Sequence, residues 1–279
     1  MKDRLNKCTI VIIAFLILVS CRSENEPEKK WVIKKTISID GVNPIGITQK
    51  GDELWLSDAD HNRLVQIDSE GEILQILNGF DRPMHIAANE DELYIPQYGA
   101  DTIAVISEND RKTLSLSQKL DAPSGISIYK LEKAIADFYN NRILYYNGKE
   151  WDSFGQKGNA NGQFYYPTDV EITENEIWVA DAYNHRVQVF DKQKNFLRVI
   201  GWDQSMNAAT GIYISEDEVF VTDFENDRIL IFDYEGVLKQ ELKNNVHKPT
   251  DMYIKEGVLY TLNYRQGTIN LYVQKLKDR

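Results

Sequence analysis

Residues 167–200 read PTDVEITENEIWVADAYNHRVQVFDKQKNFLRVI, and this stretch decides the fold. Apolar and polar residues alternate in it, and valine, isoleucine and aromatic residues are frequent, which predicts short β-strands. The expected strands are 169–173, 176–180, 186–190 and 196–200, separated by turns rich in Asn, Asp and Lys. Four short strands in about 40 residues are typical of one blade of a β-propeller.

The beginning of this unit recurs six times. Each copy starts with an anchor residue, usually proline, and places Gly, Asp or His two positions later. Successive anchors are 39, 40, 44, 42 and 40 residues apart. A unit of this size cannot bury both of its faces alone, so it must pack against copies of itself. The sequence therefore predicts an all-β fold, a six-bladed β-propeller of four-stranded blades. The six anchors are Pro44-Ile-Gly46, Pro83-Met-His85, Pro123-Ser-Gly125, Pro167-Thr-Asp169, Ala209-Thr-Gly211 and Pro249-Thr-Asp251.

The sixth unit is incomplete at its C-terminal end. After the strand expected at 268–273 only residues 274–279 remain, which is too few for an outermost strand. A strand-like segment at 31–39 precedes the first anchor and has no blade of its own. An unpaired edge strand is a template for aggregation, so pairing it is favourable. We therefore predict that the N-terminal strand completes the last blade and closes the ring, within a propeller domain at 31–279.

The first twenty residues have the composition of a targeting segment. Lys2, Arg4 and Lys7 precede an apolar run over 8–19, which is typical of a secretory signal peptide and too short for a spanning helix. The residues before Cys21 resemble the bacterial lipobox, which implies lipidation of Cys21. Residues 21–30 have no apolar side chain to bury beyond Cys21, and predict a solvated tether. We expect a lipid-anchored protein of the cell envelope, at the outer membrane.

Charge and cysteine content narrow the function further. Without residues 1–20 the chain has 29 basic and 42 acidic residues, a net charge of −13. Such a body repels phosphate backbones, so we expect no nucleic-acid ligand. With Cys8 in the signal peptide and Cys21 acylated, no thiol remains for a disulfide, a zinc-thiolate site or a nucleophile. We expect a monomer held together by its apolar core.

Two segments of the fourth unit carry a family resemblance. Residues 154–167, FGQKGNANGQFYYP, and residues 179–191, VADAYNHRVQVFD, resemble an NHL repeat, including the Asn184-His185-Arg186 step. The resemblance implies a six-bladed propeller. The chain as a whole resembles the six-bladed propeller lipoproteins that are common in Bacteroidetes. Amidating lyases share these repeats, but they use several histidines around a channel zinc, and this sequence lacks them. Lactonase-type propellers hold a calcium ion with several carboxylates and amides, and few such residues are available here. RNA-binding NHL domains use a basic face, which a body with a net charge of −13 is not expected to provide.

Four units contain an Asp and an Arg five residues apart. A catalytic set needs a different role at each position, whereas equivalent copies favour a structural turn. The carboxylate would accept backbone N–H bonds and the guanidinium would tie strands or blades together. We therefore predict that these pairs are structural: Asp58 with Arg63, Asp137 with Arg142, Asp181 with Arg186, and Asp223 with Arg228.

Residues that depart from the repeat are the better candidates for function. In this fold, the segment entering each innermost strand and the loop between the second and third strands lie at one end of the channel. Side chains that differ from the repeat in these places should lie together at one opening of the channel. Neutral variation in exposed loops would also explain why these residues differ from the repeat. The predicted binding residues at this channel rim are His85, Gln97, Tyr98, Asp169, Asp251, Tyr264 and Arg265.

No metal or catalytic set follows from the sequence. A catalytic zinc site needs about three N/O ligands, and only His85 of the four histidines occupies a channel position. Asp169 and Asp251 could hold calcium, but no calcium-binding loop accompanies them. We therefore expect no cofactor, with calcium as the open alternative. The predicted function is a non-catalytic binding module for a protein, peptide or glycan. The alternative is a calcium-assisted hydrolase or lyase at the channel mouth, and a purely structural envelope component also remains open.

Overall fold

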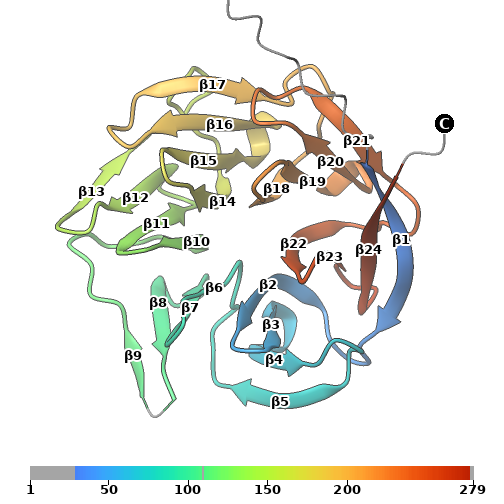
Figure 1. Ribbon diagram of the computed structural model, residues 1–279. Coiled ribbons are helices and arrows are strands. Elements are labelled where there is room, and N and C mark those ends of the chain that lie inside the picture. The colour runs from blue at the N-terminus through green and yellow to red at the C-terminus, as the bar shows by residue number, and fades with distance from the viewer. Residues whose placement is uncertain (1–28, 109, 277–279) are drawn as a thin grey trace, which may run out of the picture.

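Six four-stranded antiparallel sheets surround a central axis in the computed structural model, which describes residues 29–108 and 110–276 (Figure 1). The predicted six-bladed all-β propeller is confirmed. In each blade the strand order follows the chain from the axis outward, and only the last blade differs. The predicted signal peptide and Cys21 lie outside the described residues. Within the described ranges, no helix is both long enough and apolar enough to cross a membrane.

The first three blades contain the strands β2 (Pro44–Lys50), β3 (Glu53–Asp58), β4 (Arg63–Ile67), β5 (Ile73–Asn78), β6 (Ala87–Ala88), β7 (Leu93–Gln97), β8 (Thr102–Ile106), β9 (Arg111–Thr113), β10 (Pro123–Tyr129), β11 (Glu132–Asp137), β12 (Arg142–Tyr146) and β13 (Trp151–Phe154). The last three contain β14 (Pro167–Ile172), β15 (Glu176–Asp181), β16 (Arg186–Asp191), β17 (Phe196–Ile200), β18 (Ala209–Ile214), β19 (Val219–Asp223), β20 (Arg228–Phe232), β21 (Leu238–Leu242), β22 (Pro249–Lys255), β23 (Val258–Asn263), β24 (Thr268–Leu276) and β1 (Lys29–Ser38). Three short 3-10 turns follow second strands: η1 (Ala59–His61), η2 (Ala182–Asn184) and η3 (Phe224–Asn226).

The N-terminal strand closes the ring as predicted. β1 pairs antiparallel with β24, from Lys29 opposite Leu276 to Ser38 opposite Thr268, and so becomes the outermost strand of the sixth blade (Figure 1). β24 starts beside the loop that joins it to β23. The end of β1 therefore lies on the face of the ring that carries the loops between second and third strands. Lys29 lies on the opposite face. β1 therefore begins on the face opposite the loops that join second and third strands.

The core is divided among the blades. Six apolar clusters fill the spaces between neighbouring sheets, one for each of the six blade contacts. Trp178, for example, belongs to the fourth blade and packs with side chains of the fifth, such as Phe232. Apolar side chains on both faces of every sheet are thus covered only when the next blade is present, which is why the blades must close into a ring.

The repeated Asp and Arg residues form buried ion pairs, which confirms their predicted structural role. All four aspartates are fully buried, and each accepts a hydrogen bond from the Arg Nε at 2.6 to 2.9 Å. In the fourth blade Asp181 also accepts from the backbone N–H of Tyr165, while Arg186 donates to the carbonyl of Gln163. The pair therefore fastens the segment that leads into the innermost strand of its own blade.

Candidate functional site

The third residue of each innermost strand segment lies at the same level of the channel, one from every blade. Around the ring this position alternates between glycine and a polar side chain. The polar members come from the second, fourth and sixth blades, so they approach one another across the axis rather than side by side. In ring order the six residues are Gly46, His85, Gly125, Asp169, Gly211 and Asp251.

A belt of hydroxyl groups holds the innermost strands together at the preceding position. Each hydroxyl donates to the carbonyl of the anchor residue in the next blade, at distances from 2.9 to 3.3 Å. These hydrogen bonds draw the strand starts close to the axis, which positions the polar residues that follow. The four bonds run from Ser124 to Pro167, Thr168 to Ala209, Thr210 to Pro249, and Thr250 to Pro44.

Asp169 and Asp251 are almost fully buried and held by backbone donors. Asp169 Oδ2 accepts from the N–H of Ile212 in the next blade at 2.9 Å, and Oδ1 accepts from the N–H of Val170. Asp251 repeats this arrangement with Ile47 at 2.9 Å and Met252 at 2.8 Å. Each carboxylate therefore links two blades, and each oxygen keeps a second lone pair for another partner.

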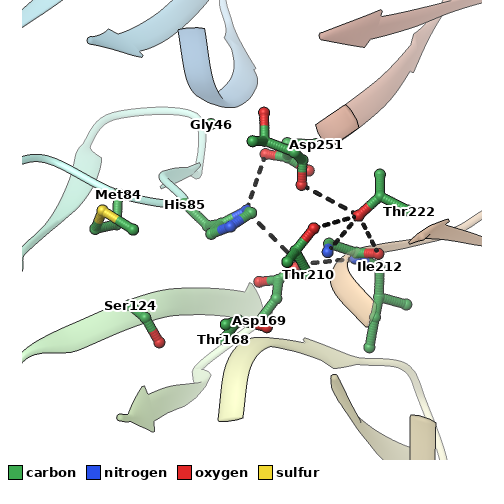
Figure 2. Close-up of polar contacts among 12 residues, drawn as sticks. Gly46, Met84, His85, Ser124, Thr168, Asp169, Thr210, Ile212, Thr222 and Asp251 are labelled. Atoms are coloured by element: carbon green, nitrogen blue, oxygen red, sulfur yellow. Dashed lines mark hydrogen bonds and ion pairs between the residues drawn. The ribbon is translucent and has the colours of Figure 1, made fainter. Parts of the chain in front are cut away.

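His85 points toward both carboxylates from the second blade (Figure 2). Its Nδ1 lies 3.5 Å from Asp251 Oδ2 and 4.0 Å from Asp169 Oδ2, and this buried atom has no hydrogen-bond partner among the described residues. The register of β6 and β7, continued by two residues, places Pro96 opposite His85. Because proline has no N–H to donate, the ladder is interrupted there. The N–H of His85 donates to Ser124 in the next blade.

Gly46 allows this close approach. A Cβ at this position would lie 2.7 Å from the carbonyl oxygen of Met84 and 2.9 Å from the Cα of His85, both of which are backbone atoms.

We expect Gly46→Ala to lower the free energy of unfolding by about 1–3 kcal/mol and to displace His85, because backbone atoms cannot move aside as a flexible side chain does. Urea denaturation checks this. Lys50→Ala, at the end of the same strand, should change stability by less than about 0.5 kcal/mol; equal effects of both variants would contradict the clash.

A cavity of about 240 Å³ extends from the level of His85 toward the ends of the innermost strands. Its ionisable lining consists of His85, Asp169, Asp251, Glu171 and two tyrosines, Tyr213 and Tyr253, with no lysine or arginine. Glu171 accepts a hydrogen bond from the hydroxyl of Ser127 at 2.8 Å. The cavity thus collects three carboxyl groups around one imidazole.

Burial and mutual repulsion shift the protonation of these groups. Burial raises the pKa of Asp169 to about 6, with a contribution from the charge of Asp251, although the imidazole of His85 lowers it. Burial, together with Asp169, raises the pKa of Glu171 well above its usual value. Burial lowers the pKa of His85, but the charges of Asp169 and Asp251 outweigh this effect and raise it overall. Asp169 can therefore exchange a proton at mildly acidic pH, and the protonation of the neighbouring groups depends on its charge.

A larger groove of about 1360 Å³ lies beside this cavity, among the hairpins that end the innermost strands of the third to sixth blades. Tyr213 lines both spaces, so they adjoin. The groove contains four glutamates and one arginine, Arg198, which donates to Glu176. This face of the ring is therefore acidic, and it is also the face from which β1 begins.

The opposite face displays a continuous cluster of aromatic rings. Neighbouring rings contact one another with centroids 4.5 to 5.8 Å apart. Tyr139 is 48% exposed and Tyr183 is 54% exposed. Trp202, in the loop that leads to β18 on this face, is 76% exposed. We define the aromatic face as Tyr98, Phe138, Tyr139, Tyr165, Tyr166 and Tyr183, which come from the second, third and fourth blades.

The structure divides the predicted binding residues between these places. His85, Asp169 and Asp251 come together inside the channel, whereas Tyr98 belongs to the aromatic face. Tyr264 pairs with Phe224 and donates to Asp60, and Arg265 lies 3.7 Å from Asp60. Gln97 accepts from the N–H of Asp81 and donates to Thr102, so it takes the place of the Asp in the repeated ion pair.

Several site residues were missed from the sequence. Glu171 and Tyr213 occupy the fifth position of their innermost strands, two residues beyond the variable position that drew attention to His85. Period-two alternation along a strand predicts that such residues share its face, so this signal was present. The sequence also contained a signal for the aromatic face, because aromatic residues follow the repeated turn Asp of the third and fourth blades, at Phe138, Tyr139 and Tyr183.

Comparison with known proteins agrees with the propeller fold. The NHL repeat family model matches residues 164–190. The protein brain tumor of Drosophila melanogaster is 48% identical over 44 residues, which are 15% of this chain and 4% of that protein. A streptogramin B lyase structure has a TM-score of 0.65 and 14% identity, over 90% of this chain and 88% of that one. A catalytically inactive histidine-to-alanine variant of virginiamycin B lyase from Staphylococcus aureus, with quinupristin, has a TM-score of 0.63 and 16% identity over 88% and 89%.

These likenesses and the strand topology define a class. The chain is a six-bladed β-propeller, and its fourth blade carries an NHL repeat over β14, β15 and β16. The match to the curated relative spans a small fraction of that protein, and the likeness to the lyases, at 14% and 16% identity, shows the fold alone.

Proposed function

We propose that this protein is a membrane-anchored envelope lipoprotein whose propeller binds a protein or peptide ligand through the aromatic face. The observation that carries the proposal is the continuous set of six contacting rings, two of them about half exposed, on one face of a rigid ring. Tyrosine offers a large, stiff contact area and a hydroxyl group, and it is frequent among residues that dominate binding energy. Monomeric proteins seldom display such a cluster without a binding role.

Two cations at the edge of the cluster favour a peptide over a glycan. The guanidinium of Arg82 lies 4.7 Å from the ring centre of Tyr98, and the ammonium of Lys157 lies 5.1 Å from that of Tyr165. These groups can form ion pairs with carboxylates of a ligand whose apolar side chains pack against the rings. An acidic, aromatic-containing peptide segment therefore fits this face best.

The direction of β1 supports the anchoring part of the proposal. β1 begins on the face opposite the aromatic face, with Lys29 beside Leu276. Only residues 22–28 separate Cys21 from Lys29 in the sequence, and a chain spans at most about 3.3–3.6 Å per residue, so a lipid on Cys21 would stay near this face. The acidic face would then lie toward the membrane and the aromatic face away from it, where a macromolecule can reach it. We propose the outer membrane as the site of anchoring.

Binding arrays of peptides and of glycans, probed with the purified protein, test this function. We expect peptide ligands, and we expect the Tyr139→Ala, Tyr183→Ala double variant to lose at least about tenfold in affinity, roughly 1.4 kcal/mol. Leu131→Ala is the matched control, because Leu131 is 73% exposed in a hairpin on the opposite face. Glycan binding that depends on the same tyrosines would show that the ligand is a glycan and not a peptide. Peptide binding that survives in the double variant, or that Leu131→Ala removes, would contradict the aromatic face as the site.

A second candidate function is a lyase or hydrolase reaction in the channel. The specific observation in its favour is the cavity that combines His85 with Asp169, Asp251 and Glu171 beside a large groove. The fold is also similar to that of lyases that act on streptogramins, as their names state. Quinupristin, which is present in the structure of the inactive virginiamycin B lyase variant, is a direct test compound. Conversion of quinupristin that is lost in both His85→Ala and Glu171→Gln would support this function, and conversion that is unchanged in both variants would contradict a reaction in the channel.

A further inference from the structure

Three alternate blades aim one ligand-type side chain each at a single point in the channel. His85, Asp169 and Asp251 lie 84 and 82 residues apart in the chain, yet their ligand atoms are all within 4.8 Å of one another (Figure 2). All three are 4 to 6% exposed. Both aspartates are held by two backbone N–H groups each, so their oxygens are already oriented. Such outer contacts are what orients ligands in known metal sites.

The cavity contains more carboxyl groups than cationic side chains. Three carboxyl groups, those of Asp169, Glu171 and Asp251, line it, and no lysine or arginine does. A buried ionised carboxylate is costly unless it is paired or coordinates a metal. One imidazole can supply at most a single positive charge. A divalent cation would neutralise the two aspartates that face His85.

The imidazole of His85 adds an independent indication. Its Nδ1 is buried and aimed at the two carboxylates, but at 3.5 and 4.0 Å it makes no hydrogen bond with them. Buried polar atoms without a partner are rare, and each needs an explanation. Two atoms bound to the same zinc-sized ion are separated by at most about 4.2 Å, since each bond is about 2.1 Å long. Both distances from Nδ1 lie within that limit.

We infer that His85, Asp169 and Asp251 bind one divalent transition-metal ion of the zinc class. One imidazole nitrogen and two carboxylate oxygens are the ligands that such ions accept. Calcium would need six to eight oxygen ligands, and the cluster offers too few. Three protein ligands leave a coordination position open toward the cavity, where Glu171 and Tyr213 lie. A water molecule held there would have Glu171 nearby as a proton acceptor, which is an arrangement used in metal-assisted hydrolysis and elimination.

Zinc binding by the purified, chelator-treated protein tests the inference without any organic ligand. Titration calorimetry with zinc sulfate should show one ion per chain, and zinc should raise the melting temperature. His85→Ala should lower the affinity by at least about 100-fold and abolish the thermal shift. His247→Ala is the matched control, because His247 is exposed and its side chain lies outside the cluster; it should behave as wild type.

Cobalt provides a readout that needs no variant. Cobalt(II) bound at this site should give visible absorption bands typical of a few N/O ligands, and zinc should displace it. Failure of the wild-type protein to bind zinc, or retention of one tightly bound ion by His85→Ala, would overturn the inference. The result is independent of the aromatic face, since the Tyr139→Ala, Tyr183→Ala variant should still bind zinc normally.

Discussion

Trp31→Ala is expected to lower the free energy of unfolding by about 3–5 kcal/mol, the usual cost of removing a large buried aromatic side chain. Trp31 is 5% exposed and packs edge-to-face on Phe220 of the fifth blade, with ring centres 5.8 Å apart. Its Nε1 donates to Glu218 at 2.8 Å, and its backbone exchanges two hydrogen bonds with Gln240. The side chain therefore fastens the closing strand β1 to the neighbouring blade as well as to its own.

Ile33→Ala, in the same strand, is the control. Ile33 is 38% exposed, so we expect a loss of less than about 1 kcal/mol. Equilibrium urea denaturation measures both variants, and hydrogen exchange locates the effect. In Trp31→Ala the amides of β1 and β24 should exchange faster than those of the other blades, because opening begins where the ring closes. Equal destabilisation by the two variants, or uniform exchange over all blades, would show that closure does not depend on this contact.

Asp181→Ala is expected to have a comparable effect, about 3–5 kcal/mol, because it leaves the Arg186 Nε–H and the Tyr165 N–H without their acceptor and the guanidinium without its counter-charge. The carboxylate accepts from the N–H of Tyr165 and from the side chains of Asn184, Arg186 and Gln188, at distances of 2.8 to 3.0 Å. Removing it takes one acceptor from each of these side chains, whose donor groups keep their bonds to backbone carbonyls of residues 158–163. Denaturation in urea gives the change in free energy.

The sixth blade suggests a matched rescue. There Asn263 and Thr268 occupy the positions of the ion pair, and Asn263 Nδ2 donates to Thr268 at 3.0 Å. The double variant Asp181→Asn, Arg186→Thr copies this uncharged pair, so it should lose less stability than Asp181→Ala alone. Glu174→Ala removes a solvent-exposed pair with Lys130 and should cost less than about 1 kcal/mol. A stability of Asp181→Ala close to that of Glu174→Ala would contradict the structural role of the repeated pair.

The site was predictable only in part. The variable third position of the innermost strand identified His85, Asp169 and Asp251, because a repeat makes departures from it visible. The same reasoning selected Gln97, which performs the common backbone role with an uncharged side chain, since an amide oxygen accepts the same N–H bond as a carboxylate. From the sequence, zinc was set aside because only one histidine occupied a channel position, and calcium at Asp169 and Asp251 stayed open. The two aspartates and His85 were not considered together as ligands of one ion, because sequence alone does not show that their side chains meet.

The sequence by itself determined the number of blades, the four strands of each and the closure by the N-terminal strand. These follow from local periodicity and from one leftover segment, which are properties of residues near one another in the chain. Only the tertiary structure decided which side chains meet in the channel and on which face each surface lies. Residues 84 and 82 positions apart are brought together by the closure of the ring, and the antiparallel register of β1 with β24 sets the face from which the chain enters. Neither depends on local sequence, because the first arises from the packing of blade on blade and the second from the pairing of strands at opposite ends of the chain.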